Sequence, residues 1–382
     1  MVKRLMIYAR GTGLGHQRRT RNIALEVLSR EPECSVLILV DENAAPFFEP
    51  VSGIDYIRLP QVWRTEGFNY RSDKLKLSIE EVIKLRVGII LQTFRVFQPE
   101  VVLADYNPIG PMGELKEMLD EAVHSTHPPR LYFGSRDIID LPEVIQHEWT
   151  QTDAYGYLGH YDGVLVYGSQ DIYDTDSAYH FSSHAREVIY CNYVAPIPET
   201  ALSDQADDDP IVLVMSGSGR WSFPIESAFV KALPLIDEAI PFHSVVLTGP
   251  NMEPEEREQL AKSAQSLPYS LQVLGSVKDA IQLIRRAALI VSMGGYNSLG
   301  EILQLRKKAL IVPKFHRLFE QEMRVQLFAE RGLIKTLPME DLTPETLAQG
   351  LLQLYQTEGI PNLANLPKFD GAQRAAKVIL DD

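Results

Sequence analysis

The sequence has few cysteines and no long apolar run. Two cysteines, Cys34 and Cys191, lie far apart in a chain of 382 residues. That spacing fits neither a metal-binding knuckle nor a disulfide framework, so a reducing cytosol is the simplest setting. No apolar stretch reaches the roughly 18 residues that a membrane-spanning helix needs, and the apolar part of the N-terminus is too short for a secretory signal. We therefore expect a cytoplasmic protein.

The chain also lacks an excess of positive charge. Lys and Arg number 37 against 51 Asp and Glu, a net charge of −14. General nucleic-acid binding needs a basic face, so nucleic acid is not an expected partner. The charge is uneven, however, since residues 1–100 hold 15 basic and 12 acidic side chains and residues 101–200 hold 4 and 16. A locally basic N-terminal surface is therefore expected.

Within that basic part, residues 74–95 mix lysines and arginines with Leu, Ile and Val. One interpretation is a basic amphipathic helix that lies on anionic lipid, which would make the protein peripheral at the inner membrane face. The other is a helix packed on the core with a solvated outer face. The five basic residues of the pattern are Lys74, Lys76, Lys84, Arg86 and Arg95.

Short apolar runs alternate with helix-length segments, which predicts an α/β fold built on open parallel sheets. In the first half the runs are 5–9, 35–40, 101–104, 130–134 and 163–167. The helix-length segments between them lie near residues 16–30, 78–97, 111–123 and 142–150.

A polar, proline-marked stretch at 201–210 interrupts this alternation and is interpreted as a linker. A second alternation then begins, with runs at 211–215, 244–247, 271–274, 289–291 and 309–312. We expect two Rossmann-like, doubly wound domains, residues 1–200 and 211–382, that face each other across a cleft. The last segment, 371–380, is an amphipathic helix whose partner the sequence leaves open, the first domain included.

The loop after the first predicted strand is rich in glycine and ends in His16. Glycines such as Gly13 and Gly15 let the backbone approach a ligand closely, and the helix that follows offers free N–H groups. The spacing is not the dinucleotide fingerprint, because the third glycine comes one residue early and His16 takes its place. A helix start disfavours positive charge, so the imidazole is expected to be neutral and able to accept a proton. The alternative is a capping or core histidine.

Asp105 ends a buried strand at the same predicted sheet edge as His16. Ligands of open α/β sheets bind at the carboxyl ends of the strands. Its carboxylate is placed to orient the imidazole or to bind a hydroxyl group. The alternative is an N-cap for the next helix.

In the second domain, Ser216, Gly217 and Ser218 form the turn after its first strand. Small hydroxyl residues with glycines suit a phosphate nest. No Gly-Lys-Ser/Thr sequence follows, so this is not a P-loop, and a plain turn is the alternative.

The most specific pattern is residues 292–301, which leave a buried strand and open a helix that suits a diphosphate. Glu301 lies about one to one and a half turns inside that helix and is placed to reach a ribose diol; the alternative is a solvated carboxylate. The residues assigned to the diphosphate platform are Met293, Gly294, Gly295, Asn297 and Ser298.

Glu320 and Gln321 begin a further helix after a strand and can bind sugar hydroxyls. The loop before them offers Lys314, His316 and Arg317 as phosphate partners. A solvated loop with charged side chains is the alternative.

Together these motifs resemble GT-B glycosyltransferases, closest to the group related to family 28, over nearly the whole chain. The loop with His16 resembles that family's N-terminal loop, residues 292–301 its donor-binding helix, and Glu320-Gln321 its sugar-binding pair. The stretches 135–138, 161–168 and 293–297 look more like a branch of predicted glycosyltransferases than the lipid-II-forming N-acetylglucosaminyltransferases. The acceptor signature of those enzymes is not apparent.

The resemblance implies an inverting transfer of a sugar from a nucleotide-diphosphate sugar, a UDP-sugar, to a hydroxyl group of an unidentified small molecule, lipid or glycan. It implies His16 as the base with Asp105 nearby. Thr248, Gly249 and Val277 would flank the nucleobase. It implies no metal and no cofactor other than the nucleotide-sugar co-substrate, because the helix dipole and loop N–H groups stabilise the leaving diphosphate.

Two alternatives belong to other functional classes. One is an enzyme like UDP-N-acetylglucosamine 2-epimerase, which shares the two-domain fold and needs no acceptor. The other is a non-catalytic nucleotide-sugar-binding protein, which would bind donor without turnover.

Overall fold

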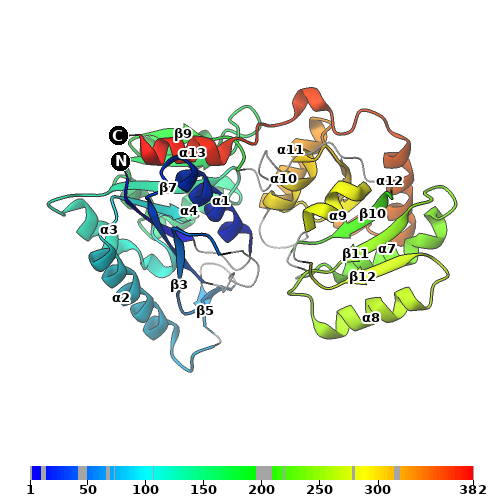
Figure 1. Ribbon diagram of the computed structural model, residues 1–382, viewed down its shortest axis with the longest axis horizontal. Coiled ribbons are helices and arrows are strands. Elements are labelled where there is room, and N and C mark those ends of the chain that lie inside the picture. The colour runs from blue at the N-terminus through cyan, green and yellow to red at the C-terminus, as the bar shows by residue number, and fades with distance from the viewer. Residues whose placement is uncertain are drawn as a thin grey trace. The chain divides into compact units, whose positions relative to one another are not determined.

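The chain folds into two compact α/β units (Figure 1). Unit 1 comprises Met1–Val194 and Lys368–Asp382, and unit 2 comprises Ala195–Pro367. Parallel sheets in both units confirm the predicted fold class. The computed structural model describes residues 2–9, 14–41, 50–65, 69–72, 74–105, 107–194, 209–217, 219, 221–277, 280–313 and 319–381.

Unit 1 is built on a parallel seven-stranded sheet of order β3-β2-β1-β6-β7-β8-β9. The register pairs Ala9 with Asp105 at the carboxyl ends of the central strands β1 and β6. The loops that follow these two strands therefore start side by side. The strands are β1 (Arg4–Ala9), β2 (Ser35–Val40), β3 (Ile54–Arg58), β6 (Val101–Asp105), β7 (Arg130–Arg136), β8 (Gly163–Tyr167) and β9 (Val188–Tyr190), with a separate hairpin of β4 (Trp63–Arg64) and β5 (Tyr70–Arg71).

The helices of unit 1 are fixed by clear local signals. In α2, Ser78 and Glu81 form a capping box at the N-terminus, and Gln98 ends the helix in the left-handed conformation. Its buried face places Ile90 and Phe94 in the core of the sheet. The helices are α1 (Leu14–Arg30), α2 (Ile79–Phe97), α3 (Lys116–Val123), α4 (Pro142–Gln151), α5 (Ala154–Leu158), α6 (Thr175–Tyr179) and α13 (Gly371–Leu380).

Helix α13 comes from the end of the sequence but packs against α1 (Figure 1). The Arg130 side chain at the start of β7 donates a hydrogen bond of 2.9 Å to the carbonyl of Ile379. The buried stripe of this helix contains Ala372, Ala375, Ala376 and Ile379.

Unit 2 is built on a parallel six-stranded sheet of order β12-β11-β10-β13-β14-β15. The register pairs Met215 with Leu247 on one side and with Ser292 on the other, and Ser292 with Ile311. The loops after these strands therefore emerge at one edge. The strands are β10 (Ile211–Met215), β11 (His243–Leu247), β12 (Leu271–Leu274), β13 (Ala287–Ser292), β14 (Lys308–Ile311) and β15 (Lys335–Thr336).

Helices α7 and α12 pack together and share one core with the sheet of unit 2. Val214, Phe229, Val291 and Leu351 are fully buried in it. The helices are α7 (Phe223–Ile236), α8 (Pro254–Gln265), α9 (Ala280–Arg286), α10 (Tyr296–Gln304), α11 (Glu320–Glu330) and α12 (Pro344–Gln356). In the described ranges, no helix is long and apolar enough to cross a membrane.

The basic pattern at 74–95 was partly misread from the sequence. Arg86 does not face solvent: it is fully buried, with Nε 2.5 Å from Glu114 Oε2 and Nη1 2.8 Å from Asp41 Oδ1. Its assignment to a lipid-facing stripe is therefore wrong, because two buried carboxylates hold it on the core side of α2. Lys74, Lys76 and Lys84 are exposed, as expected.

Candidate active site and donor-binding site

His16 and Asp105, 89 positions apart in the sequence, meet at the carboxyl edge of the unit 1 sheet. His16 lies in the first turn of α1 and Asp105 ends β6. The distance from His16 Nδ1 to Asp105 Oδ1 is 3.1 Å. The Asp105 side chain is fully buried, and that of His16 is 16% exposed. A buried carboxylate beside a partly accessible imidazole is an arrangement suited to proton transfer.

A third residue, Arg19, joins this pair and was missed in the sequence. It donates from Nε to Asp105 Oδ2 at 3.0 Å and from Nη2 to Asp105 Oδ1. Nη2 also lies 2.8 Å from His16 Nδ1, and the guanidinium stacks over the Tyr167 ring at 5.2 Å. The available signal was the spacing, because positions three apart share a helix face. Neighbouring Arg18 and Arg21 made Arg19 look like one more surface charge.

Burial and the neighbouring charges together set the protonation states of Asp105 and His16. Burial alone would raise the pKa of Asp105, but the Arg19 charge and hydrogen bonds from His16 and Arg19 hold that pKa below its usual range. Burial lowers the pKa of His16 to about 4, with help from Arg19 and Arg136 and against the pull of Asp105. At neutral pH the imidazole is therefore neutral, and burial is the main cause.

The geometry of Nδ1 leaves two tautomers for the neutral imidazole of His16. If Nδ1 carries the proton, it donates to Asp105, and Nε2 is the nitrogen that can take up a proton. If Arg19 donates to Nδ1, the proton resides on Nε2 and the ring is a donor. Only the first tautomer can act as a base, and the carboxylate of Asp105 then stabilises the imidazolium that forms.

In unit 2, the start of α10 has the features of an anion-binding site. Gly294 has φ +79°, and a Cβ there would lie 2.5 Å from Val325 Cγ2 and 2.9 Å from Ile311 Cγ2. Gly295, the N-cap, has φ −62°, and a Cβ there would meet nothing within 4 Å. The first glycine is therefore required by packing, whereas the second borders open space in front of the helix N–H groups.

The loops after β10 and β11 lie close to this helix start. A Cβ on Gly217, which has φ +64°, would lie 3.7 Å from Ser298 Oγ, so the turn after β10 borders α10. A Cβ on Gly219 would collide with the carbonyl oxygen of Thr248, so the same turn packs on the end of β11. The structure thus gathers three of the predicted donor segments at one sheet edge.

Two of the predicted hydroxyl residues, Ser216 and Thr248, use their hydroxyl groups inside the protein. Ser216 donates to Glu226 Oε1 at 2.8 Å, and Thr248 Oγ1 donates to the carbonyl of Leu274 at 3.3 Å. The contribution of these two residues to a ligand would therefore come from their backbone. Glu226 and the α8 residue Arg257 were both missed in the sequence.

Arg257 links two of the loops that were predicted to flank the nucleobase. Its Nη2 donates to the carbonyl of Gly249 at 3.1 Å. A Cβ on Gly275 would lie 3.1 Å from its Nη1. Val277, two residues further along, is half-buried.

The acidic residues assigned to the sugar nucleotide are buried. Glu301 is 3% exposed, so its alternative interpretation as a solvated helix carboxylate is wrong. Glu320 is 7% exposed and accepts from Arg324 Nη2 at 2.9 Å. Arg324 in turn lies over the ring of Tyr296, which ties the start of α11 to that of α10.

Gln321 has a side-chain oxygen that no described residue uses. Its Oε1 is buried and has no hydrogen-bond partner among the described residues. A buried acceptor of this kind is costly unless something donates to it. A ligand hydroxyl would satisfy it.

The other predicted residues lie in the core, at the starts of helices, or outside the described ranges. Met293 is buried in the unit 2 core, whereas Asn297 and Ser298 are half-buried at the helix start. Gly15 lies in the first turn of α1. The described residues contain no group of acidic, His or Cys side chains that could hold a metal ion. The predicted residues outside the described ranges are Gly13, Ser218, Lys314, His316 and Arg317.

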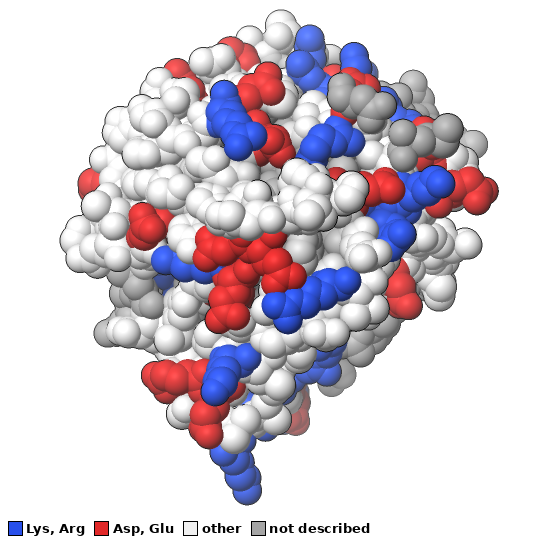
Figure 2. Space-filling model, turned by 90° about the vertical axis from the view of Figure 1, so that its left-hand side faces the viewer, with Lys and Arg blue, Asp and Glu red and all other residues white. Residues whose placement is uncertain are grey.

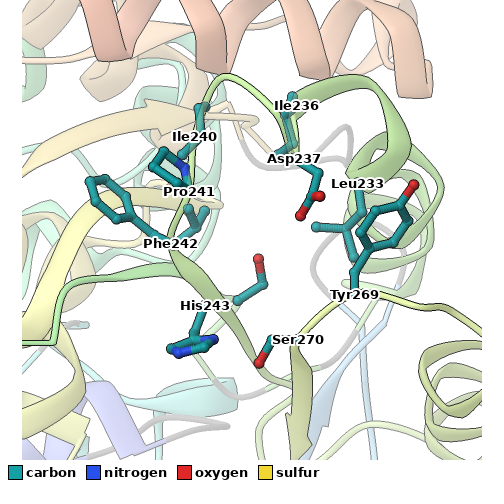
Figure 3. A pocket seen from close by; sticks show the side chains of 11 residues that line it. Leu233, Ile236, Asp237, Ile240, Pro241, Phe242, His243, Tyr269 and Ser270 are labelled. Atoms are coloured by element: carbon teal, nitrogen blue, oxygen red, sulfur yellow. The ribbon is translucent and has the colours of Figure 1, made fainter.

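The cavities found elsewhere were not anticipated from the sequence. One, of about 300 Å³, lies at the amino ends of β10, β11 and β12, opposite the donor loops. Figure 3 shows Asp237 pointing into it, with Phe242 and Tyr269 on opposite sides. Another, of about 490 Å³, lies in unit 1 beside Trp149 and Tyr155.

Comparison with known proteins finds sequence similarity in the second half of the chain. Residues 211–377 match the glycosyltransferase family 28 C-terminal domain. An uncharacterised glycosyltransferase of Methanopyrus kandleri is 27% identical over 173 residues, 45% of either chain. The UDP-N-acetylglucosamine–N-acetylmuramyl-(pentapeptide) pyrophosphoryl-undecaprenol N-acetylglucosamine transferase of Rhizobium rhizogenes is 24% identical over 176 residues, 46% of either chain. The chain thus spans about half the length of the curated relatives it matches.

Solved structures share the fold over the whole chain. The glycosyltransferase of kitacinnamycin has a TM-score of 0.68 at 13% identity and covers 99% of this chain and 98% of its own. A putative UDP-N-acetylglucosamine 2-epimerase from Listeria monocytogenes has a TM-score of 0.65 at 14% identity and covers 99% and 94%. Residues 211–377 thus match the glycosyltransferase family 28 C-terminal domain, and the whole chain shares its fold with solved GT-B glycosyltransferases.

Proposed function

We propose that the protein transfers a sugar from a UDP-sugar to a hydroxyl group of an acceptor, with inversion at the anomeric carbon. The observation that carries this proposal is the contact between His16 and Asp105. His16 takes the acceptor proton at Nε2, while Asp105 accepts from Nδ1–H and stabilises the imidazolium. A base of this kind contributes about 10²–10⁴-fold to turnover.

Unit 2 supplies the donor side of the proposal. The N–H groups at the start of α10 and the turn after β10 bind the diphosphate, and the helix dipole stabilises it as it leaves. Glu301 binds the ribose, and Glu320 with Gln321 binds sugar hydroxyls. We propose that this requires no metal. The UDP nucleotide is proposed because the Rhizobium rhizogenes relative and the Listeria monocytogenes structure both carry UDP-N-acetylglucosamine in their names.

A donor screen by thermal unfolding tests the binding half of the proposal. A ligand present at 100 times its dissociation constant stabilises the folded state by about 2.7 kcal/mol. UDP-sugars should raise the melting temperature, and the variant Glu301→Gln should reduce that rise. Absence of any shift with every nucleotide-sugar would overturn the assignment of unit 2.

The variant His16→Ala tests the catalytic half. UDP release in the presence of a hydroxyl acceptor should fall at least about a hundredfold, while UDP binding stays near the wild-type value because unit 2 holds the nucleotide. Asp105→Asn should cost less than His16→Ala if Asp105 only orients the ring. Near-normal turnover of His16→Ala would make His16 a capping residue.

The epimerase alternative is separated by leaving out the acceptor. It is considered because the Listeria monocytogenes structure shares this fold. Incubation with UDP-N-acetylglucosamine alone would then yield the 2-epimer, which a transferase does not form. Donor binding with neither epimerisation nor turnover on any acceptor would favour a non-catalytic binding protein.

We also propose that unit 1 contacts an anionic membrane through the residues before α2. Leu75 and Leu77 are 40% and 44% exposed, and they alternate with exposed Lys74 and Lys76. Figure 2 shows basic side chains at the lower tip of this face, where Figure 1 places the start of α2. Exposed leucines between lysines suit an acidic lipid surface.

Co-sedimentation with vesicles tests the membrane proposal. The protein should bind phosphatidylglycerol-containing vesicles at low salt and not phosphatidylcholine vesicles. The double variant Leu75→Ser, Leu77→Ser should lose binding. The control Leu235→Ser, at an exposed leucine of unit 2, should keep it. Equal binding of both variants would remove the proposed surface.

A further inference from the structure

A carboxyl group lies buried beneath the turn that follows β10. Glu226, in the first turn of α7, is fully buried. Its Oε1 lies 2.8 Å from Ser216 Oγ and 3.1 Å from Ser222 Oγ. Its Oε2 is buried and has no hydrogen-bond partner among the described residues. An ionised carboxylate in this position would leave a buried, charged oxygen unpaired, which is costly.

The hydrogen count favours a neutral acid. Ser222 Oγ has one hydrogen but two acceptors within reach, Glu226 Oε1 and the carbonyl of Gly219 at 2.9 Å. If Glu226 carries a proton on Oε1, it donates to Ser222, and Ser222 donates to Gly219. Ser216 still donates to the carboxyl group. With this third hydrogen, each of the three oxygen–oxygen contacts is a hydrogen bond, and Ser216, Gly219 and Ser222 are held together through Glu226.

The surrounding charges act in opposite directions on the pKa of Glu226, and burial has the largest effect. From α8, Glu256 opposes ionisation of Glu226, and Arg257 favours it. From the turn, the hydroxyl groups of Ser216 and Ser222 favour it as well. Burial is the largest effect and raises the pKa of Glu226 to about 7.

We propose that Glu226 is a positioning residue of the donor site: its neutral form holds Ser216, Gly219 and Ser222 together, and protein in which it is ionised takes up a proton when the donor diphosphate binds. This rests on the proposed function, since it needs the diphosphate at the start of α10. Gly217 in this turn borders Ser298 of that helix. Phosphate charges placed there repel a carboxylate, so the bound state favours the protonated form.

The consequence is a pH-dependent affinity for donor. Above the pKa of the free protein, each pH unit should weaken binding by up to about tenfold, because one proton must be bound with the ligand. UDP-N-acetylglucosamine is the probe, since its diphosphate diester does not titrate near neutral pH, unlike the terminal phosphate of UDP. The variant Glu226→Gln keeps a neutral group of the same shape and should bind with an affinity independent of pH.

Calorimetry in buffers of different ionisation enthalpy counts the protons directly. At pH 8 the wild-type protein should take up more than about half a proton per UDP-N-acetylglucosamine bound, and Glu226→Gln should take up none. The control Glu256→Gln removes a nearby carboxylate outside the hydrogen-bond network and should retain the uptake. A merely structural role for Glu226 would leave the proton count unchanged between wild type and Glu226→Gln.

The outcomes separate the two proposals. Binding of the probe with no proton uptake by the wild-type protein, or with equal uptake by Glu226→Gln, overturns the role of Glu226 and leaves the proposed function intact. Failure to bind this probe or any other nucleotide-sugar overturns the proposed function, and the role of Glu226 with it. If Glu226→Ala does not fold, the glutamine variant still decides.

Discussion

At the scale of single residues, the candidate active site depends on compensation between buried charges. Asp105 is fully buried, and Arg19 rather than His16 supplies the full positive charge that offsets it. Because Arg19 neutralises the carboxylate, the imidazole of His16 remains uncharged. A neutral ring and an ionised partner are the resting states that a base needs.

The acid limb of the pH–rate profile should follow His16. With a pKa of about 4, the ring stays neutral far below pH 6, so kcat/KM should fall only near pH 4. Arg136 lowers this pKa by its charge, so Arg136→Gln should move the limb to higher pH by about half a unit to one unit. Arg95→Gln, at an exposed arginine paired with Glu121, should leave it in place. A limb near pH 6.5 in the wild-type protein would contradict this.

The same carboxyl group that couples to donor binding should also shape stability. The pKa of Glu226 is raised from 4.5 to about 7 in the folded state, so the native protein binds the extra proton between these values. The protonated Glu226 therefore contributes to the free energy of unfolding at low pH. This contribution, on the order of 3 kcal/mol in all, is lost as the pH rises toward 7. Relative to the wild-type protein, Glu226→Gln should become more stable between pH 5 and pH 8 in urea unfolding. A constant difference across that range would speak against a buried proton.

What the sequence predicts at this scale depends on backbone position. His16 and Asp105 were found because both follow strands whose ends are neighbours in a doubly wound sheet. Arg19 and Glu226 were missed because no local sequence pattern distinguishes them from helix residues that face solvent. Their importance comes from burial, which depends on the tertiary packing of α1 and α7.

At the scale of elements, two neighbouring glycines at the start of α10 have different roles, one in packing and one beside the proposed ligand. Gly294 is held by Val325 and Ile311, and Gly295 borders open space. The sequence pattern named both glycines without distinguishing them, because the distinction depends on helix α11 and strand β14. Among the strands, β3, β9 and the two-residue strands β4, β5 and β15 were not predicted. The alternation of β3 leaves it half-exposed, and β9 has three residues.

The two glycines should therefore respond differently to alanine. Gly294→Ala forces a side chain into a left-handed conformation and against Val325 and Ile311, and should destabilise unit 2 by about 1–3 kcal/mol. Gly295→Ala should change stability by less than about 0.5 kcal/mol yet weaken UDP-N-acetylglucosamine binding, because its methyl group occupies the space before the helix N–H groups. Thermal unfolding and calorimetry of both variants measure this. Unchanged binding by Gly295→Ala would place the diphosphate elsewhere.

At the scale of the whole molecule, the end of the chain belongs to the same unit as its beginning. Helix α13 follows unit 2 in the sequence but is part of unit 1. The two alternations of strands and helices could be predicted because each buried strand is a short apolar run in the sequence. The sequence predicts that the last helix is amphipathic. Its apolar stripe of Ala375, Ala376 and Ile379 indicates that another element covers it, but not which one. The partner, α1, is more than 340 residues away, and no local pattern identifies it.

Because α13 belongs to unit 1, a mutation in this helix should destabilise unit 1 rather than unit 2. Ile379 and Leu351 are both fully buried, and replacement by alanine removes about three side-chain carbons from each, at a cost of about 2–5 kcal/mol. Ile379 belongs to unit 1, although it follows unit 2 in the sequence. Ile379→Ala should therefore speed amide hydrogen exchange in β1 and β6 and leave β10 and β13 protected, whereas Leu351→Ala should do the reverse. Mass spectrometry of the exchanged peptides reads both sheets in one experiment. Faster exchange in all four strands of either variant would mean that the two units unfold as one.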